Sequence, residues 1–151
     1  NRFPVVHAMK LFEPTMIGDY RVTALPSNHS ESSETVLYII EHNGKSVFWI
    51  HDSGLLLEET VDYLRTLDIC FDAVSMDCTL KRGSFFTPLH MDILQCKETK
   101  DLLSQMGRIN DKTVCILSHI GHLIETTHDE LSAEAEEFGF IVAYDTMETE
   151  I

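Results

Sequence analysis

The sequence lacks several features that would assign a protein to a class at once. It has no apolar run near the ~18 residues that a membrane-spanning helix needs, so we expect no insertion into a bilayer. Its first residues, Asn1 to Pro4, lack the basic stretch and apolar stretch of a signal peptide. Cys-x-x-Cys spacing is also absent. We therefore expect a cytoplasmic protein with four reduced core cysteines, which are Cys70, Cys78, Cys96 and Cys115.

Basic residues are scarce. The chain has 11 lysines and arginines against 25 aspartates and glutamates, which gives a formal net charge of −14. An anionic surface repels phosphate backbones, so a nucleic-acid partner is not expected. A small anionic substrate remains compatible with this charge if metal ions or clustered donors offset it locally. The length of 151 residues and a hydrophobic content of 44% suffice for one modest domain with its own core.

Hairpin patterns come first along the chain, and alternating strands and helices follow. Asn43-Gly44 is a strong two-residue turn signal, because both residues tolerate positive φ. Thr127 and Glu130 match a capping box that opens a helix ended by Gly139. This order predicts an α/β (α+β) fold, with a mixed sheet and helices on one face. Strands are predicted at 3–12, 20–25, 35–41, 46–50, 71–76, 112–117 and 140–144, and helices at 56–67, 91–106 and 127–138.

Three short segments place histidine or aspartate directly after a predicted strand, where mixed sheets bind ligands. They are LPSNHS with His29, VFWIHDSG with His51 and Asp52, and CILSHIGH with His119 and His122. Imidazole and carboxylate suit zinc or manganese. Each residue also has an ordinary structural interpretation: a lone histidine after a strand is often just a satisfied polar group, and Asp52 could cap the helix near residue 56. Spacing alone leaves both interpretations open.

In order, the three segments resemble the third, fourth and fifth metal motifs of the metallo-β-lactamase superfamily. The segments VSMDCT, PLHMDI and FIVAYDTMETEI further resemble the cyclic phosphodiesterases of bacterial phosphonate breakdown. The resemblance runs from about residue 5 to the end of the chain. It implies the carboxyl-terminal half of an αββα sandwich, and a hydrolase of small cyclic phosphodiesters that uses two divalent metal ions, zinc or manganese.

The resemblance also implies roles for single residues. His29 would bind one metal ion, Asp52 would bridge the two, and His119 would bind the second. His90, in PLHMDI, would face the substrate phosphate as a catalytic residue that stabilises charge or protonates the leaving group. His122 and His51 would support the ligands from behind or anchor the loop, and His51 could also add a ligand.

Departures from the family pattern limit what the chain can do by itself. The signature His-x-His-x-Asp-His loop, which supplies most metal ligands in the family, is absent from this sequence. We therefore expect it in a preceding amino-terminal half, and we expect the isolated chain to bind metal weakly and to be inactive. Two alternatives remain: a tRNA 3′-end nuclease-like hydrolase, and a non-catalytic fragment or module that needs a partner.

A half-domain should expose the inner face of its sheet. An exposed apolar face of that size favours association, so we expect either a homo-oligomer or association with the missing half. The residues expected on this face are Val22, Val36, Tyr38, Ile40, Phe48, Ile50, Val74, Ile116 and Val142.

Overall fold

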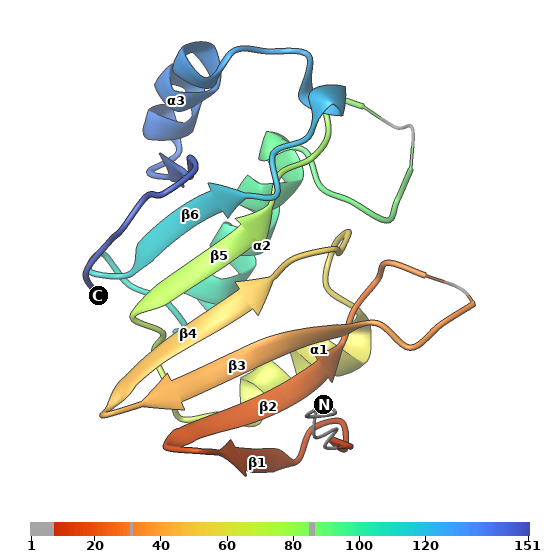
Figure 1. Cartoon of the computed structure of the whole chain (residues 1–151), viewed down its shortest axis with the longest axis vertical. Helices are drawn as coiled ribbons and strands as arrows, with labels where there is room; N and C mark the ends of the chain where they lie inside the picture. Colours follow the sequence, from red (N-terminus) through yellow and green to blue (C-terminus); the bar gives the residue numbers. More distant parts are fainter. Residues whose placement is uncertain (1–7, 31, 85–86) are drawn as a thin grey trace, which may run out of the picture.

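The chain forms one mixed sheet with helices packed against it (Figure 1). The computed structural model describes residues 8–30, 32–84 and 87–151, and within these ranges there are seven strands, three α-helices and one short 3-10 helix. The predicted α+β class with a mixed sheet is confirmed. The strands are β1 (Pro14–Ile17), β2 (Tyr20–Pro26), β3 (Val36–His42), β4 (Lys45–Ile50), β5 (Ala73–Asp77), β6 (Val114–Ser118) and β7 (Ile141–Val142), and the helices are α1 (Glu58–Thr66), α2 (Ile93–Gln105), η1 (His122–Ile124) and α3 (His128–Glu137). No helix within the described ranges has the length and apolar character to cross a membrane.

The strands lie across the sheet in chain order. β1 to β4 pair antiparallel, and β4 to β7 pair parallel. Since β3 runs opposite to its neighbours, β2 points in the same direction as β4, β5 and β6. The carboxyl ends of these four strands therefore meet at one edge of the sheet, seen on the right of Figure 1.

Local signals in the sequence fix several of these elements. Asn43 and Gly44 both adopt positive φ, 50° and 76°, and they close the β3–β4 hairpin as predicted. Thr127 forms the predicted capping box with Glu130 at the start of α3. Asp92 forms a second capping box with Gln95 at the start of α2, which the sequence analysis did not identify.

Over residues 8–12, the described part of its range, the first predicted strand is not formed. Residues 3–7 of the predicted range 3–12 lie outside the described residues, and residues 8–12 contribute only an isolated bridge between Leu11 and Ala24. Among the described residues the first strand is β1, which pairs with β2 around the Gly18-Asp19 turn. Because Gly18 adopts a φ of 61°, the chain reverses there, and the residues just before the turn are the ones that pair.

One face of the sheet carries the core. Buried side chains from α1, α2 and α3 join one cluster with alternate residues of β2 to β7, and Figure 1 shows α1 and α2 behind the sheet. The register places Phe48, Ile50, Val74 and Val142 on this helix-covered face, so their assignment to an exposed inner face was wrong. The opposite face, which we call the open face, carries the other five predicted residues, Val22, Val36, Tyr38, Ile40 and Ile116, together with Trp49.

Three of the four cysteines are core residues as predicted, and all four are free thiols. Burial raises the pKa of the Cys96 and Cys115 thiols above their usual value, so both stay protonated at neutral pH. Cys70 is exposed, in contrast to the prediction. It lies in the loop before β5, where its sulfur accepts a hydrogen bond from Asn110.

Phe48 and Trp49, which are neighbours in β4, test the assignment of side chains to the two faces of the sheet. Phe48 is fully buried under the helices, whereas Trp49 is 42% exposed on the open face. Phe48→Ala should lower the free energy of unfolding by about 3–5 kcal/mol, because it leaves a cavity in the core. Trp49→Ala should cost about 1 kcal/mol or less, since the partly exposed indole loses only cross-strand contacts and its contact with the His51 ring. Urea denaturation of both variants measures the difference, and equal losses would contradict the register.

Candidate metal centre

Four strand ends and one loop bring the candidate site together. His29 follows β2, Asp52 follows β4, Asp77 is the last residue of β5, and His119 follows β6. His90 arrives from the loop between β5 and α2. Because the four strands end at the same edge, residues that are up to ninety positions apart in the chain become neighbours in space.

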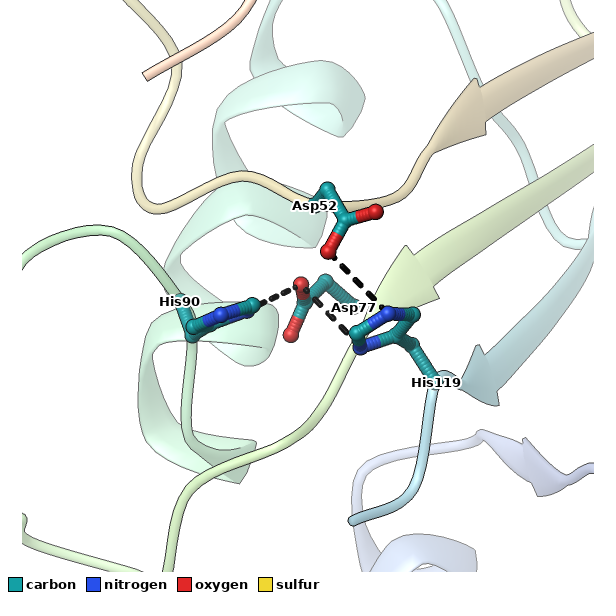
Figure 2. A group of neighbouring side chains, drawn as sticks. All are labelled: Asp52, Asp77, His90 and His119. Carbon is teal, nitrogen blue, oxygen red and sulfur yellow. Dashed lines mark hydrogen bonds and ion pairs between the residues drawn. The ribbon is translucent and has the colours of Figure 1, made fainter. Parts of the chain in front are cut away.

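The side chains converge closely enough to hold a metal ion. Asp52, Asp77, His90 and His119 each offer a ligand atom, and these atoms all lie within 4.8 Å of one another (Figure 2). His119 Nε2 is 3.1 Å from Asp52 Oδ1, and His29 Nε2 is 3.7 Å from the same oxygen. The expected convergence of His29, Asp52 and His119 is therefore observed, and His90 lies in the same cluster.

Hydrogen bonds select the ring nitrogen that each histidine presents. Thr79 Oγ1 donates its proton to the carbonyl oxygen of His119, so it accepts from His119 Nδ1, both at 2.8 Å. His29 Nδ1 lies 3.2 Å from the carbonyl oxygen of Leu89, which can only accept. Both rings therefore carry a proton on Nδ1 and turn Nε2 toward Asp52. Nε2 is thus the nitrogen that each ring would offer to a metal ion.

Asp77 is the site residue that the sequence analysis missed. Its side chain is fully buried, and Oδ2 accepts from His90 Nδ1 at 2.7 Å and from the Ser53 amide at 3.3 Å. Oδ1 accepts from the Thr79 amide at 3.1 Å. Although Asp77 lies within ligand distance of the cluster, these bonds occupy most of its lone pairs, so it fits the role of orienting His90 better than that of a metal ligand. Its place at the end of a buried strand was the available signal.

The structure excludes the interpretation of Asp52 as a helix cap. Helix α1 begins after Leu57, which makes no side-chain cap, so Asp52 does not cap that helix. Its carboxylate is half exposed and faces the two histidines. Asp52 and His119 both adopt positive φ, 49° and 56°. Non-glycine residues held in this region cost of order 1 kcal/mol or more and gather at functional sites.

His51 and His122, the two histidines expected to support the ligands, lie in different surroundings. His51 Nε2 is 2.7 Å from Ser75 Oγ, and its ring centroid is 4.1 Å from that of Trp49. Burial lowers the pKa of His51 to about 4, and the nearby His119 ring acts in the same direction, so His51 is neutral at pH 7. His122 is exposed in η1. It is not one of the four residues whose possible ligand atoms lie within 4.8 Å of one another.

Gly54 lies where the loops that carry His29, Asp52 and His90 contact one another. Its amide donates to the Asn28 carbonyl at 2.9 Å, and Asn28 Nδ2 donates to the Pro88 carbonyl at 3.3 Å. A Cβ atom on Gly54 would lie 1.8 Å from the Pro88 oxygen. Only glycine permits this approach, which keeps the loops of His29, Asp52 and His90 together.

Structural comparison identifies the architecture. One similar structure is a diphosphatase of the PhnP family, which aligns with a TM-score of 0.65 and 17% identity, over 93% of this chain and 46% of its own. YhfI of Bacillus subtilis, a metallo-β-lactamase fold protein, aligns with a TM-score of 0.67 and 19% identity, over 91% of this chain and 52% of its own. This chain has the metallo-β-lactamase fold. Zinc-bound PqqB of Methylobacterium extorquens aligns with a TM-score of 0.66 and 18% identity, over 95% of this chain and 55% of its own.

The likeness is one of fold, because the identities are below 20% in all three cases. A comparison with models of known protein families found no match, and a comparison with curated proteins found none either. This chain spans about half the length of the metallo-β-lactamase-fold structures described above. The expected resemblance to metallo-β-lactamase-fold proteins is thus confirmed in three dimensions.

His119 and His122 offer a matched test of the metal centre, because they lie three residues apart and only His119 faces Asp52. We expect the chain to bind zinc weakly, and His119→Ala to weaken that binding by more than ~tenfold. His122→Ala should leave it unchanged. Since imidazole must be deprotonated to bind a metal ion, acidification should also weaken the binding. Calorimetric titration measures both effects, and equal losses in the two variants would contradict the site.

Gly54→Ala should separate the interlocked loops. The added methyl group must push the Pro88 segment away by more than an ångström, which costs about 1–3 kcal/mol and loosens the metal centre. Gly121→Ala is the milder comparison, since its Cβ would meet only a Thr79 methyl group at 3.3 Å. Thermal denaturation and zinc titration should rank Gly54→Ala as the more damaging change, and the reverse order would refute the interlock.

Proposed function

We propose that this chain is the carboxyl-terminal half of a two-metal phosphoester hydrolase that acts on small phosphodiesters, cyclic phosphates among them. One observation carries the proposal: two histidines, each with its Nδ1 proton engaged, present Nε2 to a single oxygen of Asp52, beside the Asp77–His90 pair. A likeness to a PhnP-family diphosphatase supports phosphoester chemistry over other reactions of this fold.

The donor set suits zinc or manganese. His29 and His119 would each hold one ion through Nε2, and the Asp52 carboxylate would be a ligand shared by both ions. When bound, such ions polarise a phosphoryl oxygen and lower the pKa of a bound water. Three ligands are too few for two ions, which supports further ligands from an amino-terminal half.

We infer that His90 moves a proton in the reaction. Its Nδ1–H donates to Asp77 at 2.7 Å, which fixes the ring and leaves Nε2 available at the site. A proton held at Nε2 would pass to the leaving oxygen of the ester, and the buried Asp77 carboxylate would offset the positive charge of the ring while it carries that proton. Asp77 is thus a positioning residue, and His90 is the group that would touch the substrate.

The open face supports the proposal of a missing half. It presents Trp49 at 42% and Ile141 at 46% exposure, with half-buried Tyr38, Ile40 and Ile116 beside them. In an αββα sandwich this face would pack against the sheet of the amino-terminal half, burying apolar side chains. Without that half, we propose that two copies of the chain pair through it. A cytoplasmic location remains part of the proposal, supported by the four free thiols.

The amino-terminal half can be tested directly. The reading frame upstream of this chain should encode His-x-His-x-Asp-His. The full-length protein should hydrolyse bis(p-nitrophenyl) phosphate, and a chelator should abolish that activity. His90→Ala should lower kcat by about 10²–10⁴-fold, because proton transfer is lost, with the metal content unchanged.

His122→Ala is the matched control, since His122 lies outside the cluster, and it should keep full activity. Activity that survives complete metal removal would exclude the two-metal hydrolase. A His90→Ala variant with unchanged kcat would exclude the proton-transfer role while leaving the metal centre intact.

A further inference from the structure

Asp52 has an unusual backbone conformation at the point where it faces the two histidines. Its φ is 49°, in the left-handed region that residues other than glycine rarely adopt. Figure 2 shows its carboxylate directed at His119 from the segment that follows β4. Such a conformation lies above the ordinary ones in free energy, so it persists only where neighbouring groups hold it in place. Two side chains from other strand ends provide these contacts.

The peptide group between Asp52 and Ser53 is hydrogen-bonded at both of its polar atoms. Its carbonyl oxygen, which belongs to Asp52, accepts a hydrogen bond from Ser27 Oγ at 2.6 Å. Its amide, which belongs to Ser53, donates to Asp77 Oδ2 at 3.3 Å. Because a peptide group is planar and this one is bonded on both sides, it resists rotation, and this restricts the backbone of Asp52 to the observed conformation.

Ser27 is itself fixed at the base of the loop between β2 and β3. Its amide donates to the Thr35 carbonyl at 2.9 Å, and its carbonyl accepts from Thr35 Oγ1 at 3.2 Å. The residue is only 8% exposed, so water competes little for its hydroxyl group. A serine hydroxyl has one proton to donate, and here that proton goes to Asp52. Ser27 therefore joins the loop that carries His29 to the backbone of Asp52.

The Ser27 hydrogen bond is the stronger of the two. A distance of 2.6 Å lies at the short end of the range for hydroxyl donors, whereas 3.3 Å is just beyond the usual range for an amide donor. Asp77 also accepts from His90 and from the Thr79 amide, so a substitution at Asp77 would disturb the orientation of His90 as well. Ser27 is thus the residue through which the conformation of Asp52 can be changed with the Asp77–His90 bond left in place.

We propose that Ser27 is a positioning residue of the metal centre, whose hydroxyl keeps Asp52 in the conformation that binds metal. This inference rests on the proposed function, because it takes Asp52 as a metal ligand. Without the hydroxyl, the free chain would populate relaxed conformations in which the carboxylate is turned away from His29 and His119. A metal ion would then bind only the fraction of molecules that keep the left-handed conformation, and the apparent affinity would fall by that fraction.

Ser27→Ala removes this hydroxyl, and Thr60→Val is the matched control. Thr60 is also buried, and its Oγ1 donates to the Pro26 carbonyl at 2.9 Å, one residue before Ser27. Each variant leaves one carbonyl without its hydroxyl donor, so the two should lower the melting temperature by similar amounts. In calorimetric titration only Ser27→Ala should weaken zinc binding, by about tenfold.

A second measurement needs no metal. In the zinc-free chain the Ser53 amide should exchange slowly with deuterium, because it donates to the buried Asp77 carboxylate. Ser27→Ala should speed this exchange more than Thr60→Val does, since only Ser27→Ala frees the peptide group to rotate. NMR spectroscopy follows this single amide. Rapid exchange of the Ser53 amide in the unsubstituted chain would show that the peptide group is not held, and would overturn the inference without any variant.

The outcomes separate this inference from the proposed function. If His119→Ala weakens zinc binding while Ser27→Ala binds zinc as tightly as the unsubstituted chain, the metal centre stands and the role of Ser27 is refuted. Equal losses of affinity in Ser27→Ala and Thr60→Val would also refute it, since a general loss of stability would then explain both. If the chain binds no zinc but Ser27→Ala selectively speeds Ser53 exchange, the metal proposal fails while the control of the Asp52 backbone by Ser27 stands.

Discussion

The carboxylate of Asp77 is the interaction on which the site depends. It is fully buried at the end of β5 and accepts hydrogen bonds from the Ser53 amide, the Thr79 amide and His90 Nδ1. These bonds join the β4–α1 loop, the end of β5 and the β5–α2 loop at one point. Without them a buried charge would lose its partners, and His90 would lose the group that orients it.

The direction of the strands makes this arrangement possible. Because β2, β4, β5 and β6 point the same way, four strand ends supply neighbouring polar side chains, and the close contact of Gly54 with the Pro88 carbonyl holds the loops at that edge. The helix-covered face carries the hydrophobic core, while the open face leaves Trp49 and Ile141 partly exposed. Under the proposed function, metal binding and proton transfer take place at neighbouring side chains of this one sheet edge.

Much of this could be predicted from the sequence, because the signals are local. The Asn43-Gly44 turn, the Thr127 capping box and the histidines after strands follow from the conformational and chemical preferences of a few residues. The face that Phe48 and Val74 occupy could not be predicted, since continuous apolar stretches leave the alternation undefined. The role of Asp77 and the positive φ of Asp52 and His119 depend on contacts between distant segments, which no short pattern encodes.

Anomalous diffraction from crystals of the chain soaked in zinc tests the central claim most directly. The account predicts a zinc peak bonded to Asp52 Oδ1 and to Nε2 of His29 or His119, at about 2.0–2.2 Å from each ligand atom. It also predicts that the Thr79–His119 and Leu89–His29 hydrogen bonds persist in the zinc-bound crystal. Zinc bound only at exposed histidines such as His122 or His128, with the Asp52 cluster empty, would contradict the account.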